Sequence, residues 1–234
     1  MKRQKKKALL FDLDDTLWDH QKAQKSAIED ICVHHEIDFL TFYRYYHYFN
    51  QEAWNDYANK LVSLDEMRIQ RFARSLKSSR IDHLSPHMLS EEYLALYRGR
   101  ICLVEGAIEA LGALRPVFTI GVITNGSLDV QKWKLDCSQL KDYVDFMVTV
   151  DDAKCSKPSH AFFEMAFEKS GVHPRDITCI GDNFKDDIVG AIMAGAGRAV
   201  WFNPQNHSIP GEFDIQPDFM ILRLTELLNV LSIY

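Results

Sequence analysis

The sequence has few cysteines, and their spacing suits neither cross-links nor a metal site. Five of the 234 residues are cysteine, an odd number, and no two of them form a Cys-x-x-Cys pair. A disulfide framework and a cysteine-based zinc site are therefore not expected. A chain of this length can bury a hydrophobic core large enough to fold without such cross-links. This cysteine usage is typical of a protein of the reducing cytoplasm.

Long hydrophobic runs and an excess of basic charge are also missing. The first apolar run covers residues 8–11 and ends at Asp12, which is too short for a signal peptide or a membrane span. Lys and Arg total 27 against 33 Asp and Glu, a net charge of −6 that argues against binding a nucleic-acid polymer. We expect neither a membrane nor a nucleic-acid partner, and the oligomeric state stays open. A basic cluster precedes the run, where it would keep the entrance of a strand solvated: Lys2, Arg3, Lys5, Lys6 and Lys7.

Short apolar runs alternate with helical patterns over most of the chain. The runs cover residues 8–11, 118–123, 146–150, 177–180 and 199–202. Continuous apolar runs of this length are typical of buried parallel strands. Helical patterns cover residues 105–114, 128–140, 159–169 and 187–194. The alternation predicts an α/β protein with a doubly wound parallel sheet.

An insertion separates the first two predicted strands. More than 100 residues lie between them, whereas a crossover needs about a dozen. Residues 21–100 show helical spacing, many aromatic residues and no convincing strand. We expect an all-helical domain at 21–100 and a core domain formed by 1–20 and 101–234. Most of the aromatics should pack inside the insertion, with Trp54 and Tyr57 as candidates to line a cleft, and the nine histidines show no spacing typical of a metal site.

Polar residues follow three of the predicted strands at the point where each strand ends, the edge where doubly wound sheets bind ligands. They are Asp12 and Asp14 after the first strand, Thr124, Asn125 and Gly126 after the second, and Gly181, Asp182, Asp186 and Asp187 after the fourth. Each group alone also fits a turn or a helix cap, and Lys157 before Pro158 also fits a surface lysine. The patterns D-x-D-x-T and G-D-x-x-x-x-D each arise by chance in about one such chain in twenty. Both patterns in order, each behind a buried strand, predict an active site.

Four ordered motifs together resemble those of the haloacid dehalogenase-like hydrolase superfamily over nearly the whole chain. They are Asp12-Leu13-Asp14-Asp15-Thr16, Thr124-Asn125-Gly126, Lys157-Pro158, and Gly181-Asp182 through Asp187. The helical insertion after the first motif resembles that superfamily's first type of cap. A looser similarity to bacterial pyrimidine-nucleotide 5′-phosphatases rests on residues 54–57, 123–126 and 181–195.

This resemblance implies a Mg²⁺-dependent phosphatase acting through an aspartyl-phosphate. Asp12 would be the nucleophile, Asp14 the general acid and base, and Lys157 a cationic partner. Asp12, Asp182 and the backbone carbonyl of Asp14 would hold the Mg²⁺. The resemblance also implies substrate contacts at Thr124, Asn125, Gly126 and Trp54, and a supporting role for Asp187, with Asp186 as the alternative. The carboxylate of Asp14 separates this pattern from that of the true dehalogenases.

The expected substrate is a small phosphorylated metabolite, with a nucleoside 5′-monophosphate first. A sugar or acyl-sugar phosphatase and a phosphomutase remain as enzymatic alternatives on the same core. A non-enzymatic alternative is a receiver module phosphorylated on aspartate. The phosphoacceptor of such a module follows a later strand, and an insertion of about 80 residues after the first strand does not suit it.

Overall fold

The computed structural model describes residues 7–232, which form two compact units. One unit comprises the chain up to Asp19 and from Leu103 onward, and the other is His20–Cys102. The expected insertion, 21–100, lies within the second unit. The basic residues Lys2, Arg3, Lys5 and Lys6 lie outside the described residues.

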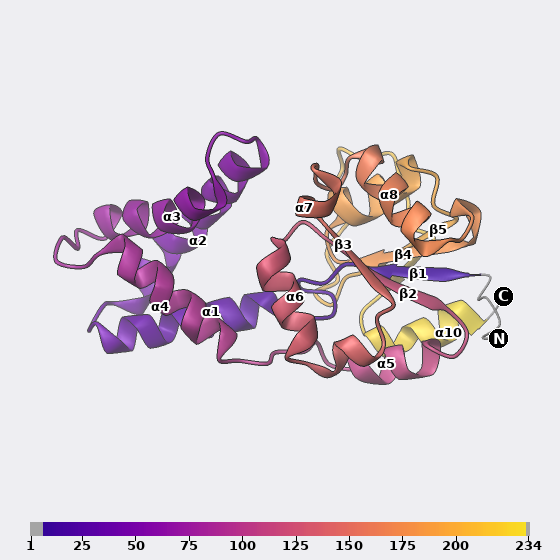
Figure 1. Cartoon of the computed structure of the whole chain (residues 1–234), viewed down its shortest axis with the longest axis horizontal. Helices are drawn as coiled ribbons and strands as arrows, with labels where there is room; N and C mark the ends of the chain where they lie inside the picture. The colour runs from indigo at the N-terminus through magenta and orange to yellow at the C-terminus, as the bar shows by residue number, and fades with distance from the viewer. Residues whose placement is uncertain (1–6, 233–234) are drawn as a thin grey trace. The chain divides into compact units, whose positions relative to one another are not determined.

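The first unit is built on a six-stranded parallel sheet, which confirms the predicted doubly wound sheet and adds a sixth strand to the five expected (Figure 1). Its strands are β1 (Ala8–Phe11), β2 (Thr119–Thr124), β3 (Phe146–Thr149), β4 (Ile177–Gly181), β5 (Arg198–Phe202) and β6 (Phe219–Ile221). Their order is β3-β2-β1-β4-β5-β6, and every neighbouring pair is parallel. The chain runs outward from β1 to β3 and then returns to place β4 on the other side of β1. This reversal leaves the ends of β1, β2 and β4 next to one another, where doubly wound sheets bind their ligands.

Helices and short turns connect the strands of this unit. They are α5 (Ala107–Leu114), α6 (Leu128–Asp136), η1 (Gln139–Asp142), α7 (Val150–Ala153), α8 (His160–Ser170), η2 (Pro174–Asp176), η3 (Phe184–Val189), α9 (Gly190–Met193), η4 (Leu224–Glu226) and α10 (Leu227–Ser232). The helix expected at 128–140 ends at Asp136 and is followed by a separate 3₁₀ turn. The helix expected at 187–194 begins earlier, as the π-helical turn η3, because the side chain of Asn183 accepts a hydrogen bond from the backbone of Asp186 and so caps it.

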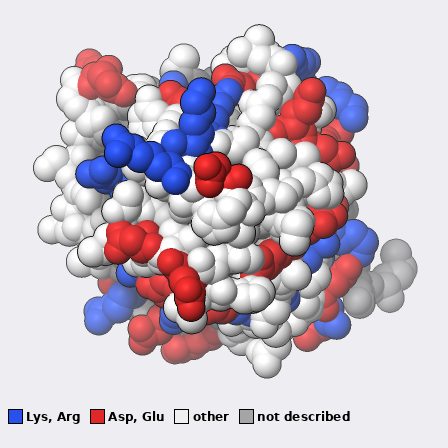
Figure 2. Space-filling model, turned by 90° about the vertical axis from the view of Figure 1, so that its left-hand side faces the viewer, with Lys and Arg blue, Asp and Glu red and all other residues white. Residues whose placement is uncertain are grey.

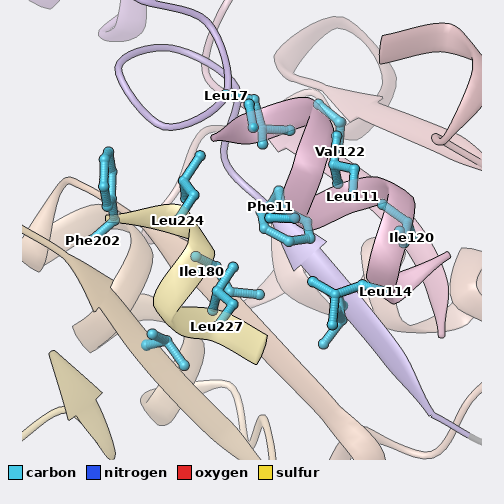
Figure 3. Packing of buried hydrophobic residues seen from close by; sticks show 14 of the residues in the cluster. Phe11, Leu17, Leu111, Leu114, Ile120, Val122, Ile180, Phe202, Leu224 and Leu227 are labelled. Carbon is cyan, nitrogen blue, oxygen red and sulfur yellow. The ribbon is translucent and has the colours of Figure 1, made fainter. Parts of the chain in front are cut away.

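Successive residues of β1 point to opposite faces of the sheet and enter two different clusters. Leu9 and Phe11 pack with α5 and α10 on one face, and Figure 3 shows Phe11 among leucines of those helices. Ala8 and Leu10 pack with phenylalanines of α8 on the other face. Figure 1 shows α8 on one side of the sheet and α5 and α10 on the opposite side. Burial on both faces explains why β1 is a continuous apolar run that ends at the first charged residue, Asp12.

The second unit consists of four helices: α1 (His20–His34), α2 (Phe39–Ala58), α3 (Leu64–Ser78) and α4 (Pro86–Arg98). Side-chain caps define three of the starts, with Asp38, Ser63 and Ser85 each accepting a backbone hydrogen bond from the first turn. Its core contains the rings of Tyr46 and Phe72, whose centroids lie 5.1 Å apart. Residues 20–102 contain no strand, so this part of the chain is helical as expected.

Two further features of the structure are the hydropathy of its helices and the charge of its surface. Within the described residues, no helix is both long enough and apolar enough to cross a membrane. Figure 2 shows one face of the molecule, on which basic and acidic side chains both occur among mostly uncharged atoms. This face therefore presents no extended surface of a single charge.

Candidate active site

The loops that follow β1, β2 and β4 meet at the carboxyl edge of the sheet. The backbone N–H of Asp12 donates to the carbonyl of Ile180 at 2.8 Å, which joins the end of β1 to the end of β4. On the other side of β1, Phe11 is in register with Val122 of β2. The sheet itself thus brings together the motifs that the sequence places more than 100 residues apart.

Lys157 stands at the centre of this group. Its ammonium donates to Oδ1 of Asp12 and to Oδ1 of Asp187, each at 2.6 Å. It also donates to the carbonyl of Ile123, at 3.2 Å, at the end of β2. The Lys157 and Asp187 side chains are each only 2% exposed. A lysine buried to this degree is stabilised by its carboxylate partners, so the surface-lysine alternative is excluded by its position.

Negative charge exceeds positive charge in this buried cluster. Three carboxylates, Asp12, Asp182 and Asp187, have ligand atoms within 4.8 Å of one another and share the cluster with one ammonium. Burial raises the pKa of Asp12 well above its ordinary value, and neighbouring carboxylates add to this against the lowering effect of Lys157. Burial, with the charges of Asp187 and Asp15, raises the pKa of Asp182 to about 8. Burial disfavours the charged form of Lys157, but Asp12 and Asp187 outweigh it and hold its pKa above the ordinary value.

This imbalance tests whether the site suits a divalent cation. When Lys157 is protonated, three ionised carboxylates leave two negative charges uncompensated. Without another cation, this excess of negative charge helps to raise the pKa values of Asp12 and Asp182. A cation of charge two would compensate the two negative charges. Oxygen donors from one or two carboxylates are the ligands that Mg²⁺ prefers in proteins. The carboxylates of Asp12 and Asp182, with Asp187 bound to Lys157 beside them, therefore fit Mg²⁺ in charge and in donor chemistry.

Hydrogen bonds from the Thr16 hydroxyl and from the backbone hold the two acidic side chains of the motif after β4, Asp182 and Asp187. The hydroxyl of Thr16 donates to Oδ1 of Asp182 at 3.2 Å, and the backbone N–H of Asp182 donates back to that hydroxyl oxygen at 3.1 Å. Asp187 Oδ2 accepts from the N–H of Asn183 at 3.0 Å. At Gly181 a Cβ atom would lie 2.2 Å from Asp187 Oδ2, so only glycine lets this carboxylate approach the end of β4.

Adjacent Asp186 and Asp187 have different partners. Asp186 Oδ2 accepts from the side-chain amide of Asn125 at 3.3 Å, away from the Lys157 ammonium that Asp187 binds. Asn125 also donates to the carbonyl of Lys157, at 3.1 Å, and accepts from its N–H, at 2.8 Å. The side chain of Asn125 thereby ties the loop after β2 to the loop that carries Lys157. Of the two acidic residues, Asp187 is the one beside the ammonium.

Thr124 ends β2 with its hydroxyl in a defined hydrogen-bonding state. Its Oγ1 accepts from the N–H of Gly126, at 3.1 Å, and from Nε2 of Gln131, at 2.8 Å. These two bonds occupy both lone pairs of the oxygen, so the hydroxyl proton is left to donate. A hydroxyl with this preference suits an oxygen of a bound phosphate.

Two residues that no sequence motif marks hold Asp14. Lys134 forms an ion pair with Oδ1 of Asp14, and Nε2 of Gln131 donates to its Oδ2 at 2.7 Å. Both residues lie on α6, and neither belongs to a motif named above. The signal available in the sequence was their spacing of three residues, which puts them on one helix face just after Thr124-Asn125-Gly126.

The helical unit contains the predicted substrate contact Trp54 and a group of two histidines and a glutamate. Trp54 is half-buried on α2, with its ring 5.8 Å from that of Tyr57 in an edge-to-face arrangement. Its contact with substrate stays a prediction.

The histidine spacing predicts no metal site, and in the fold Glu92 of α4 joins His34 and His35 in a group whose ligand atoms lie within 4.8 Å of one another. The two rings lie 2.6 and 2.7 Å from the carboxylate oxygens, and these hydrogen bonds join the end of α1 to α4.

Fold and site together define a class of enzyme. A doubly wound parallel sheet with a buried aspartate at the end of β1, paired to a buried lysine, is an arrangement typical of hydrolases. The model of the haloacid dehalogenase-like hydrolase family matches residues 6–195, and the chain belongs to this family.

Bacterial and animal proteins are among the known proteins similar to the chain. It is 26% identical to pyrimidine 5′-nucleotidase YjjG of Escherichia coli, covering 95% of this chain and 96% of that protein. It is 25% identical to N-acylneuraminate-9-phosphatase of Rattus norvegicus, covering 94% of this chain and 92% of that protein. The crystal structure of the putative HAD-hydrolase YfnB of Bacillus subtilis bound to magnesium matches with a TM-score of 0.84 and 26% identity, over 97% of this chain and 99% of that one.

Proposed function

We propose that this chain is a Mg²⁺-dependent phosphatase that hydrolyses small phosphate monoesters through an aspartyl-phosphate on Asp12. The observation that carries the proposal is the buried ammonium of Lys157, which binds Asp12 and Asp187, together with a second carboxylate, Asp14, two residues after Asp12. A nucleophilic carboxylate approaches the negative oxygens of a phosphate only where cations offset the repulsion. When bound, Mg²⁺ would supply this compensation, and Asp12, Asp182 and the backbone carbonyl of Asp14 would hold it.

Asp12 and Asp14 divide the chemistry between them. In the first step an oxygen of Asp12 forms a bond to phosphorus while the bond from phosphorus to the leaving oxygen breaks, and Asp14 gives that oxygen a proton. In the second step water attacks phosphorus, the bond to Asp12 breaks, and Asp14 takes the proton from the water. Phosphate is released and both carboxylates return to their starting states. Lys157 stays protonated throughout, as the raised pKa of its ammonium allows.

The phosphoryl group is held from the side of β2. The free proton of the Thr124 hydroxyl would donate to a phosphoryl oxygen, and backbone N–H groups of Asn125 and Gly126 would complete the binding. The side chain of Asn125 binds the Lys157 loop instead, so its contribution would be to place the lysine. Asp187 supports the same lysine.

A pyrimidine nucleoside 5′-monophosphate is the first candidate substrate, supported by the similarity to YjjG over 95% of the chain. A sugar or acyl-sugar phosphate is the second, supported by the similarity to N-acylneuraminate-9-phosphatase. A phosphomutase would use the same aspartyl-phosphate and return the phosphoryl group to the substrate. The chain would act in the cytoplasm on its small-molecule substrate.

A screen of phosphate esters tests this proposal. The chain, freed of metal with a chelator and supplied with Mg²⁺, is incubated with pyrimidine and purine 5′-monophosphates, sugar phosphates and 4-nitrophenyl phosphate, and released phosphate is measured. We expect many equivalents of phosphate per chain, fastest from one class of ester. A single equivalent retained on the protein would indicate a receiver module, and an isomeric ester in place of phosphate a phosphomutase. Failure to turn over any ester with Mg²⁺, combined with halide release from a 2-haloacid, would contradict the proposal.

A further inference from the structure

Helix α6 contributes two buried polar side chains that the proposed chemistry leaves without a role. Gln131 and Lys134 are each 1% exposed and lie three residues apart, on one face of the helix. Lysine is among the residues least often buried unless it is paired. Here Lys134 forms an ion pair with Oδ1 of Asp14, and Gln131 donates to Oδ2 at 2.7 Å. Both carboxylate oxygens of Asp14 are therefore held by one rigid element.

The amide of Gln131 also connects Asp14 to the phosphoryl-binding side of the site. Its Nε2 donates to Thr124 Oγ1 at 2.8 Å as well as to Asp14. The reverse orientation of the amide would place Oε1 against the carboxylate, so these contacts determine which way it points. Within the described part of the chain, Oε1 is buried without a hydrogen-bond partner. At Gly126 a Cβ atom would lie 1.8 Å from Nε2, so the chain leaves room for this amide and for nothing larger.

The segment after Asp14 folds back and restricts Lys134 from a second side. The backbone N–H of Asp15 donates to the carbonyl of Trp18 at 2.6 Å, which closes a tight turn. The Lys134 ammonium lies 5.9 Å from the centroid of the Trp18 ring, and Trp18 packs edge-to-face on Trp133 of α6 at 5.5 Å. The turn that carries Asp14 and the helix that holds it thus pack together.

We propose that Gln131 and Lys134 are positioning residues that hold the Asp14 carboxylate in the orientation from which it gives a proton to the leaving oxygen and takes one from water. This inference rests on the proposed phosphatase function. Proton transfer requires the carboxylate within about 2.6–3.2 Å of the oxygen it serves. The Asp14 side chain is 28% exposed, against 9% for Asp12 and 2% for Asp187, so the two contacts from α6 replace the confinement that burial gives Asp12 and Asp187.

A double-mutant cycle on two esters tests the proposal. The variants are Lys134→Met, Gln131→Met, Asp14→Asn and each α6 change combined with Asp14→Asn. The control is Lys132→Met, an exposed lysine of the same helix paired with Asp136. A nucleoside 5′-monophosphate has a leaving alcohol that needs a proton, whereas 4-nitrophenyl phosphate has one that does not. Rates of phosphorylation of Asp12 and of steady-state turnover are measured for both.

We expect Lys134→Met to lower kcat on the alkyl ester about 100-fold with KM nearly unchanged, and Gln131→Met about 10-fold. Phosphorylation by the nitrophenyl ester should change by less than about threefold, so this ester should show a burst followed by slow turnover. In the Asp14→Asn background each α6 change should alter the rates by less than about threefold, because the group it positions is gone. The control should match the wild type on both esters.

Equal losses on both esters, or losses that multiply in the Asp14→Asn background, would overturn the proposal and make these residues structural. Thermal unfolding of every variant separates such losses from misfolding. If Lys134→Met does not fold, Lys134→Arg takes its place, because it keeps a cation at this position. The ratio of its kcat on the nucleoside 5′-monophosphate to its kcat on 4-nitrophenyl phosphate then gives the same test. A wild-type chain that hydrolyses none of the esters of the phosphate-ester screen would refute the phosphatase function itself. Normal wild-type turnover with no leaving-group dependence in the variants would refute only the positioning role.

Discussion

Lys157 shows how the charge of one residue constrains the chemistry of its neighbours. It binds Asp12 and Asp187 through one buried ammonium, and the two carboxylates share its charge with Asp182 nearby. Burial and the neighbouring carboxylates therefore raise the pKa of Asp12, although the proposed reaction needs this residue ionised as the nucleophile. The site becomes active, in this proposal, when a second cation relieves that excess.

Asp12→Asn tests the nucleophile. The amide fits the same space but cannot form the acyl-phosphate, so we expect turnover of any phosphate ester to fall at least about 1,000-fold. In chelator the variant should unfold at a midpoint no lower than that of the wild type, because the neutral amide removes charge from an overcrowded site. Steady-state assays and thermal unfolding check both parts. Asp142→Asn, at an exposed position of η1, is the matched control, and wild-type rates in Asp12→Asn would contradict the assignment.

The raised pKa of Asp182 predicts how metal binding and stability depend on pH. Its folded value of about 8 lies above the ordinary 3.8, so the folded chain binds the proton more tightly than the unfolded chain. This contribution to stability is complete below pH 3.8 and is lost as the pH rises through about 8. Without metal, stability should fall between pH 6 and pH 8.5. Mg²⁺ should raise the unfolding midpoint more at pH 8.5, where no proton competes for the carboxylate.

Thermal unfolding with chelator and with Mg²⁺ at the two pH values provides this measurement. Asp182→Asn carries no titrating carboxyl at this position, so the increment due to Mg²⁺ should be smaller and should vary less with pH. An increment that is equal at pH 6 and pH 8.5 in the wild type would contradict the link between Asp182 and the metal.

At the scale of elements, the site depends on close approach between strand ends and the turns that follow them. The π-helical turn η3 begins at a residue capped by Asn183, and that start determines which side chain of η3 faces Lys157. Gly181, the last residue of β4, leaves the space that the Asp187 carboxylate occupies. A side chain at that position would push η3 away from the sheet.

Gly181→Ala is therefore expected to destabilise the fold and the site together. The added Cβ would lie 2.2 Å from Asp187 Oδ2, and an overpacked contact of this kind costs about 1–3 kcal/mol. Displacement of Asp187 should also lower kcat, because Lys157 loses a partner. Chemical denaturation and steady-state kinetics measure the two effects. Gly211→Ala, where a Cβ meets no atom within 4 Å, should change stability by less than about 0.5 kcal/mol. Equal behaviour of the two variants would contradict the close-approach argument.

At the scale of the whole molecule, the chain divides its tasks between two units. The sheet unit holds every proposed catalytic and metal-binding side chain, and the helical unit His20–Cys102 is inserted directly after the first motif. Its aromatic residues are partly engaged in its own core, as Tyr46 and Phe72 are. Trp54, half-buried on α2, remains the residue that we expect to distinguish substrates.

Trp54→Ala tests this expectation. If the residue contacts the leaving group, the variant should lose about tenfold in kcat/KM on the preferred natural ester and less than about twofold on 4-nitrophenyl phosphate. The matched control is Tyr48→Ala, an exposed aromatic of the same helix, which should leave the ranking of esters unchanged. Equal losses on all esters, with a lowered unfolding midpoint, would place Trp54 in the structural core of the unit.

Several features of this protein could be predicted from the sequence because they depend on local patterns. Continuous apolar runs predicted five of the six strands, since a strand buried on both faces has no polar positions. The carboxyl end of each strand then located Asp12, Thr124 and Asp182 at one sheet edge. The sixth strand, β6, is only three residues long, and its pairing with β5 rather than a sequence pattern makes it a strand.

Other features were decided only by the tertiary structure. Asp186 and Asp187 are adjacent and chemically identical, but successive residues of a helical turn point in different directions, so the capped start of η3 decides which one meets Lys157. Gln131 and Lys134 resemble ordinary polar residues of a surface helix until α6 packs beside the turn after β1. Glu92 joins His34 and His35 only through the packing of α4 against α1. Local patterns determine which elements form, whereas long-range packing determines which side chains meet, because partners distant in sequence leave no periodic signal.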